Sequence, residues 1–251
     1  MWLAEAKPEP SPKKAKYSGD RRREDAIFKV PKNVFCVGSG RTDSGVHSVG
    51  QVAHIKLESE RFDSNILRNA LNSLLPESVR VLRVFSVSPD FHAQRSSLKK
   101  QYTYYLQTGP CSLPHLRKIT WWIKFPLDLS KMSHSVSALV GRHDFGVFQA
   151  SDGGMQLTVR EIERIELKKV PAVSALLEDV VAVEVVGTGF LKQMVRSIVG
   201  TLVQVGNGKL PVHCFNEILS TQNRRLLGPT APARGLWLEK VWYSWGEENL
   251  D

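Results

Sequence analysis

Cysteine is scarce in this 251-residue sequence, which contains only Cys36, Cys111 and Cys214. The three are odd in number, far apart and without a Cys-x-x-Cys pair, so they argue against a disulfide framework and do not have zinc-finger spacing. We expect reduced thiols in an intracellular protein and no structural zinc. The sequence does not distinguish between cytoplasm, nucleus and mitochondrion.

Long hydrophobic runs are also missing. A membrane-spanning helix needs about 20 apolar residues, whereas the apolar stretch 180–186 has the length of a strand and is interrupted by Glu184. The apolar start 1–6 is too short for the core of a secretory signal. We therefore expect neither a membrane segment nor a secretory leader.

Acidic residues are outnumbered, with 25 Asp and Glu against 34 Lys and Arg, a net charge of +9 and a pI near 9.5. Such a surface favours a polyanionic partner such as nucleic acid, and charge alone supports a solvated basic face equally well. Residues 7–32 are rich in Lys, Arg and Pro, which predicts a disordered basic tail over 1–33. Either a nuclear signal or a tail close to RNA fits this segment.

Hydrophobic periodicity predicts a mixture of strands and helices. The helix expected at 62–75 has Asp63 or Ser64 as its N-cap and Pro76 as its stop. The fold class is therefore α+β, with antiparallel sheets and helices on one face. Strands are expected at 34–37, 53–57, 79–87, 101–108, 158–170, 176–186 and 235–243, and helices at 62–75, 131–140, 190–205 and 212–219.

A glycine-rich loop at 38–47 follows the first expected strand and carries Arg41 and Asp43. Glycine lets a backbone turn sharply and approach a ligand closely, so the loop could present Asp43 at a fixed angle. The spacing does not fit a nucleotide-binding Walker loop. Local composition by itself favours an ordinary turn with an Asx cap.

Two further segments combine cations with aromatic or apolar residues. In 91–105, basic residues alternate with aromatics, as in readers of single-stranded RNA; Tyr102 and Tyr104 would share one strand face, and Tyr104 fits the core. In 189–196, Lys192 and Arg196 would lie on one face of an apolar helix. A cation there needs either an anionic partner or a path to solvent.

Taken together, these segments resemble the TruA family of tRNA pseudouridine synthases. The resemblance rests on five motifs in order: Gly40–His47, Phe91–Ala93 with Tyr102–Tyr104, Gly141–Phe145, Gly189–Gly200 and Gly228–Leu236. Ser44 stands where the family usually has Ala, and Gln94 where it has Arg, a place that Arg95 could take.

The resemblance implies two ferredoxin-like (RRM-like) halves with antiparallel sheets around a central catalytic cleft. The expected divisions are the tail 1–33, an N-terminal half at 34–108, a C-terminal half at 109–245 and an end segment 246–251. The first half would be incomplete, because nothing in 1–32 matches the strand and helix with which the family opens.

The resemblance also implies isomerisation of uridine to pseudouridine in tRNA, in the anticodon arm, without a cofactor or metal. Asp43 would be the catalytic carboxylate, Tyr102 would stack on the flipped uracil and assist proton transfer, and Arg196 would pair with Asp43. The resemblance is compatible with a homodimer. Contacts with RNA would come from Arg41, His47, Arg95, Lys99, Lys100 and Lys192.

Two other classes of function fit parts of the sequence. Because the N-terminal half is expected to be incomplete, the chain could be an RNA-binding protein with weak or no catalytic activity. A structural interaction domain without affinity for tRNA is the third class. Release of tritium from C5 of labelled uridine separates the first two classes, and salt-dependent binding of tRNA separates both from the third.

Overall fold

The computed structural model describes residues 35–57, 63–154, 157–170 and 180–244. The chain divides into two units, Met1–Val34 and Phe35–Asp251, and the description below concerns the second. The expected tail 1–33 and the end segment 246–251 lie outside the described residues. Among the described residues, no helix has the length and apolarity that crossing a membrane requires.

A mixed sheet is the centre of the fold, and its middle strand is β4 (Ser97–Gln107). The order is β2-β9-β4-β8-β7-β6, with β5 (Trp121–Trp122) beside the end of β4. The pairs β2–β9 and β4–β5 are parallel and the others antiparallel. The expected α+β class is confirmed. The remaining strands are β2 (His47–Ser48), β6 (Gly141–Asp144), β7 (Val159–Lys169), β8 (Val180–Gly187) and β9 (Leu236–Tyr243).

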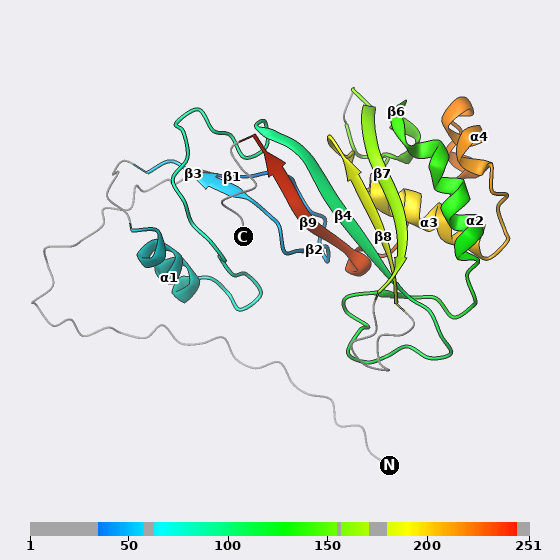
Figure 1. Ribbon diagram of the computed structural model, residues 1–251, viewed down its shortest axis with the longest axis horizontal. Helices are drawn as coiled ribbons and strands as arrows, with labels where there is room; N and C mark the ends of the chain where they lie inside the picture. The colour runs from blue at the N-terminus through cyan, green and yellow to red at the C-terminus, as the bar shows by residue number, and fades with distance from the viewer. Residues whose placement is uncertain (1–34, 58–62, 155–156, 171–179, 245–251) are drawn as a thin grey trace, which may run out of the picture. The chain divides into compact units, whose positions relative to one another are not determined.

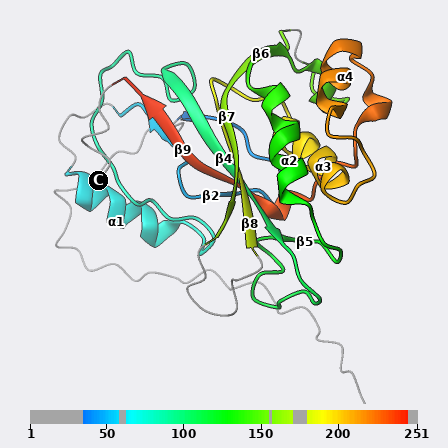
Figure 2. The same cartoon turned by 45° about the vertical axis from the view of Figure 1, so that its right-hand side comes forward.

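Three helices accompany this sheet: α2 (Leu129–Val136), α3 (Met194–Gly206) and α4 (Cys214–Thr221). In both views α2 and α3 lie together on one side of the sheet, and they contact β7 and β4 respectively (Figures 1 and 2). Short 3-10 turns occur at Ser137–Leu139, Gly146–Phe148, Arg224–Leu226 and Ala233–Gly235. Apolar residues of α3 recur at three and four positions, and Ile198, Val199 and Leu202 are fully buried in the core.

The start of α3 differs from the prediction. The helix expected from residue 190 begins at Met194, because Gln193 has a φ of 62° and so interrupts helical backbone just before it. Lys192 therefore precedes the helix and does not share a face with Arg196. The end of the helix expected at 131–140 also differs from the prediction. Helix α2 ends at Val136 and passes into a 3-10 turn, and Gly141 begins β6.

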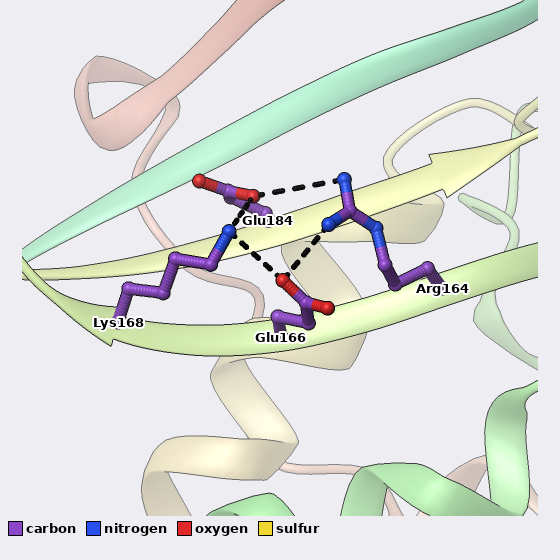
Figure 3. Close-up of polar contacts among 4 residues, drawn as sticks. All are labelled: Arg164, Glu166, Lys168 and Glu184. Carbon is purple, nitrogen blue, oxygen red and sulfur yellow. Dashed lines mark hydrogen bonds and ion pairs between the residues drawn. The ribbon is translucent and has the colours of Figure 1, made fainter.

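Buried and exposed side chains do not alternate strictly along β7, and this has a structural cause. A register shift between Ile162 and Arg164 inserts an irregularity, which lets Ile162 and Ile165 both face the core although they are three positions apart. On the opposite face, Arg164, Glu166 and Lys168 of β7 form a network with Glu184 of β8 (Figure 3). These cations are paired with carboxylates, so the network satisfies its own charges.

Before β4, besides β2, the described chain contains a separate two-stranded antiparallel sheet of β1 (Cys36–Gly38) and β3 (Ala53–Ile55), and helix α1 (Ser64–Leu74). The predicted N-cap is confirmed, since Asp63 accepts hydrogen bonds from the backbone of Asn65 and Ile66. None of the α1 residues is buried.

The strand expected at 79–87 is wrong. A strand requires a neighbour that pairs with its backbone, and none of the strands among the described residues includes this segment. Instead, the side chain of Asn72 in α1 bonds to both the backbone N–H and the carbonyl of Val81, at 2.7 and 2.8 Å. Apolar side chains of the segment stay exposed, Leu82 by 67%. Alternation alone therefore did not produce a strand.

Candidate active site

An ion pair joins the glycine-rich loop to helix α3. Nη1 of Arg196 donates to Oδ2 of Asp43 at 2.7 Å, the pairing that the family resemblance implies. Side-chain exposure is 14% for Arg196 and 26% for Asp43, so the pair is partly shielded from water and still accessible. The loop is closed beneath it by a hydrogen bond from the backbone N–H of Val46 to the Asp43 carbonyl. The carboxylate is consequently held at a defined position at the surface.

Arg196 is itself held by the segment 228–231. Its Nε donates to the carbonyl of Ala231 at 2.8 Å, and the Ala231 N–H donates back to the Arg196 carbonyl at 3.1 Å. Close approach of this segment to α3 depends on Gly200, where a Cβ atom would overlap the carbonyl oxygen of Pro229. The guanidinium of Arg196 thus bonds to two chain segments: Nε to the segment 228–231 and Nη1 to the Asp43 loop.

Tyr102 of β4 lies beside this pair. It is 8% exposed, and its ring packs edge-on against Phe190 at a centroid distance of 5.1 Å. Burial, with a smaller contribution from the Asp43 carboxylate, raises the pKa of Tyr102 to about 12. The phenol is therefore neutral across the physiological range and offers both a proton and an aromatic face. Tyr104 on the same strand face is fully buried and donates to the Pro232 carbonyl, the core position expected for it.

The stem of the Asp43 loop is braced by side chains. Nζ of Lys100 donates to the Ser39 carbonyl at 2.6 Å, and Nε2 of Gln51 donates to the Gly40 carbonyl at 2.9 Å. The Ser39 hydroxyl donates to Oε1 of Gln51 at 2.7 Å. The sequence motifs did not indicate that Gln51 and Ser39 brace the loop. An isolated polar residue beside a short strand has no spacing pattern that distinguishes it from a surface residue.

The cations expected to contact RNA differ in their surroundings. Arg41 and Arg95 are exposed, and among the described residues neither forms an ion pair. Lys99 pairs with Glu163 at 2.9 Å and lies 5.4 Å from the ring centroid of Trp242. Lys192 pairs with Asp152 at 2.6 Å. Arg41 and Arg95 can therefore bind phosphate without first breaking an ion pair with a carboxylate.

Histidines stabilise loops near these cations. Nδ1 of His92 accepts from the backbone N–H groups of Gln94 and Arg95, at 3.2 Å each, which fixes the turn that carries Arg95. The ring of His47 stacks on Trp237 at 4.4 Å, and its Nε2 lies 3.0 Å from the Lys118 carbonyl. Through these contacts His47 packs the end of the loop against β9. Its expected contact with RNA stays a prediction.

In the described part of the chain, no three His, Cys, Asp or Glu side chains gather as a metal site. The groups that do gather are a shielded carboxylate, its guanidinium partner and a neutral phenol with an apolar wall. This set can attack or deprotonate a sugar carbon and hold a flat ring, because a carboxylate is a nucleophile or base and an aromatic face stacks on a base.

Comparison with known proteins gives consistent results. A family model described as tRNA pseudouridine synthase matches residues 136–244. The tRNA pseudouridine synthase A of Maridesulfovibrio salexigens is 40% identical over 221 residues, which cover 88% of this chain and 79% of that protein. The protein of the same name from Myxococcus xanthus is 42% identical over 212 residues, 84% of this chain and 77% of that protein.

A third relative, the tRNA pseudouridine synthase A of Lactococcus lactis, is 38% identical over 218 residues, 87% of this chain and 83% of that protein. With identities well above 30% across most of both partners, the chain belongs to the TruA family of tRNA pseudouridine synthases.

Proposed function

We propose that this protein isomerises uridine to pseudouridine in tRNA, with Asp43 as the catalytic carboxylate. The observation that carries the proposal is the Asp43–Arg196 ion pair beside Tyr102, in a chain whose relatives are named tRNA pseudouridine synthase A. The substrate class comes from those names, and the roles of the residues are those that the family resemblance implies, with the geometry of the site as support.

The reaction breaks the bond between C1′ and N1, rotates the uracil and joins C5 to C1′. The proton on C5 leaves to solvent and N1 gains one, so no redox partner is required. Asp43 would act either as a nucleophile at C1′ or as a base towards the sugar. Arg196 would orient the carboxylate through their ion pair at 2.7 Å.

Tyr102 would receive the uracil once it has left the base stack. Unstacking costs a few kcal/mol, and stacking on an aromatic ring recovers about 1–3 kcal/mol of this. Phe190 holds the ring of Tyr102 edge-on at 5.1 Å, which leaves the tyrosine in one orientation. The hydroxyl, whose pKa is raised to about 12 and which is protonated at neutral pH, would assist proton transfer.

Affinity for tRNA would come mainly from phosphate contacts. Arg41, two positions before Asp43, and Arg95 on the His92-capped turn are exposed candidates, and neither forms an ion pair among the described residues. Each phosphate contact that is lost should lower the slope of log K against log salt by about 0.7–0.9. We place the target uridine in the anticodon arm on the strength of the family resemblance, and the same resemblance is compatible with a homodimer.

Tritium release tests the activity directly. The full chain is incubated with tRNA carrying tritium at C5 of uridine, and release to water should proceed with the wild type and stop with Asp43→Asn. Mapping of pseudouridine in the product tRNA then identifies the position. Salt-dependent tRNA binding without tritium release from the wild type would support the alternative of an RNA-binding protein without catalysis.

A further inference from the structure

Lys100 directs its amine to the base of the Asp43 loop instead of to solvent. Along β4, side chains alternate between the two faces, so Lys100 shares a face with Tyr102 and Tyr104, and Lys99 points to the other. Nζ of Lys100 lies 2.6 Å from the carbonyl oxygen of Ser39, a residue that is fully buried. The amine therefore reaches the point where the loop leaves β1.

A second side chain holds the next carbonyl of the same loop. Gln51 donates to Gly40 and accepts from the Ser39 hydroxyl, while the Ser39 backbone N–H donates to the Val52 carbonyl at 2.7 Å. Both peptide carbonyls that precede Arg41 are thus occupied by side-chain donors. Asp43 follows Gly40 by three positions. The two braced carbonyls therefore fix the backbone from which the Asp43 side chain extends.

The placement of Lys100 has a solvation cost. Burial lowers the pKa of its ammonium, and among the described residues no carboxylate lies within ion-pair distance of it. Lys99, its neighbour in sequence, instead pairs with Glu163 with 36% of its side chain exposed. A lysine serving only as a phosphate contact would keep its amine in water, because an ammonium is strongly hydrated.

We propose that Lys100 is a positioning residue for the isomerisation: with Gln51 it clamps the carbonyls of Ser39 and Gly40 and so holds Asp43 against Arg196. This role rests on the proposed function and replaces the contact with RNA that the sequence suggests for Lys100. The clamp acts through the backbone, so Lys100 does not touch the substrate, and its loss changes the rate of the chemical step more than the affinity for tRNA.

Two measurements on Lys100→Met test the clamp. The single-turnover rate of tritium release at saturating tRNA should fall by about 10²-fold, since a displaced carboxylate loses its alignment. The Kd for tRNA should change by less than about 3-fold, with the slope against salt unchanged. Lys100→Arg keeps a cationic donor and should recover part of the rate. Lys131→Met, an exposed lysine of α2, is the matched control and should change neither quantity.

A double-mutant cycle examines the partnership with Gln51. If both residues hold one loop, Lys100→Met and Gln51→Leu together should slow the reaction less than the product of their separate effects. If the rate of the double variant falls by the full product of the two separate effects, the two residues act independently, and this would contradict the clamp. A rise in Kd with a lower salt slope, at an unchanged saturating rate, would identify Lys100 as a phosphate contact and overturn the proposal.

Hydrogen exchange keeps the test independent of activity. Amides of residues 41–46 should exchange faster in Lys100→Met than in the wild type, whereas those of α3 should not change, and thermal melting checks that the variant is folded. Unchanged exchange in the loop would overturn the clamp. If the wild type released no tritium, the proposed function would fail, while faster exchange in the loop would still support the clamp.

Discussion

Asp43 and Arg196 are 153 positions apart in the chain, and their side chains meet at 2.7 Å. The carboxylate belongs to a loop after β1 and the guanidinium to the first turn of α3, so the contact joins two elements that are far apart in the chain. Since Arg196 also donates through Nε to Ala231, its orientation is determined from two directions. The following predictions test what each part of this arrangement contributes.

Asp43→Asn should reduce pseudouridine formation by at least about 10³-fold, because the amide is isosteric but is neither a nucleophile nor a base. Affinity for tRNA should be largely retained, since the carboxylate does not contribute attraction for phosphate. Single-turnover tritium release and filter binding measure the two quantities. A variant that keeps its rate would refute the assignment of Asp43.

Arg196→Lys should lose at least about 10-fold in rate although the positive charge is kept. A lysine has one amine and cannot reach both Asp43 and the Ala231 carbonyl with the geometry of the guanidinium fork. Arg196→Met should be slower still and should lower the free energy of unfolding by about 1–3 kcal/mol, because it leaves the carboxylate and the carbonyl without their donor. Urea denaturation measures the second effect, and equal rates for the lysine variant and the wild type would contradict the two-sided role.

The tyrosines predict a loss of stability at alkaline pH. Burial, as the main cause, raises the pKa of Tyr102, Tyr105 and Tyr243 to about 12, against the ordinary value of 10.0. The folded state therefore binds these protons more tightly than the unfolded state does. The resulting stability is fully present below pH 10 and is lost as the pH rises from 10 towards 12.

Urea unfolding at a series of pH values, with tyrosinate absorbance recorded in parallel, measures this loss. Tyr105→Phe removes one of the three phenols and its hydrogen bond to Glu239 while leaving the Asp43 site intact, so the decline above pH 10 should become shallower. A stability that stays flat to pH 12 would show that these phenols are not buried as described.

Gly200→Ala should destabilise the protein by about 3 kcal/mol or more, because its Cβ would overlap the Pro229 carbonyl and push segment 228–231 away from α3. The same displacement would remove the Ala231 carbonyl from Arg196, so the rate should fall too. Gly38→Ala is the matched control for stability, since a Cβ there meets its nearest atoms at an ordinary 3.8 Å. Similar melting temperatures for the two variants would rule out the close approach.

Much of the fold follows from local pattern. The apolar helix that contains α3, an N-cap at Asp63 or Ser64 and the strands β7 and β8 were all predicted, because each depends on periodicity or on neighbouring residues. The segment 79–87 shows the limit of such reasoning. Its alternation suits a strand, yet a strand exists only with a hydrogen-bonded neighbour, and the partner of Val81 is the side chain of Asn72.

The sequence by itself determined which chemical groups are present and in what order: a carboxylate in a glycine-rich loop, a tyrosine strand and an arginine in an apolar segment, enough to indicate the family. Tertiary structure alone decided which of them act together. The αL backbone at Gln193 separates Lys192 from Arg196, sending one to Asp152 and the other to Asp43. Burial likewise places the amine of Lys100 on a carbonyl of the loop. Such choices depend on distances between residues far apart in the chain, which local periodicity does not encode.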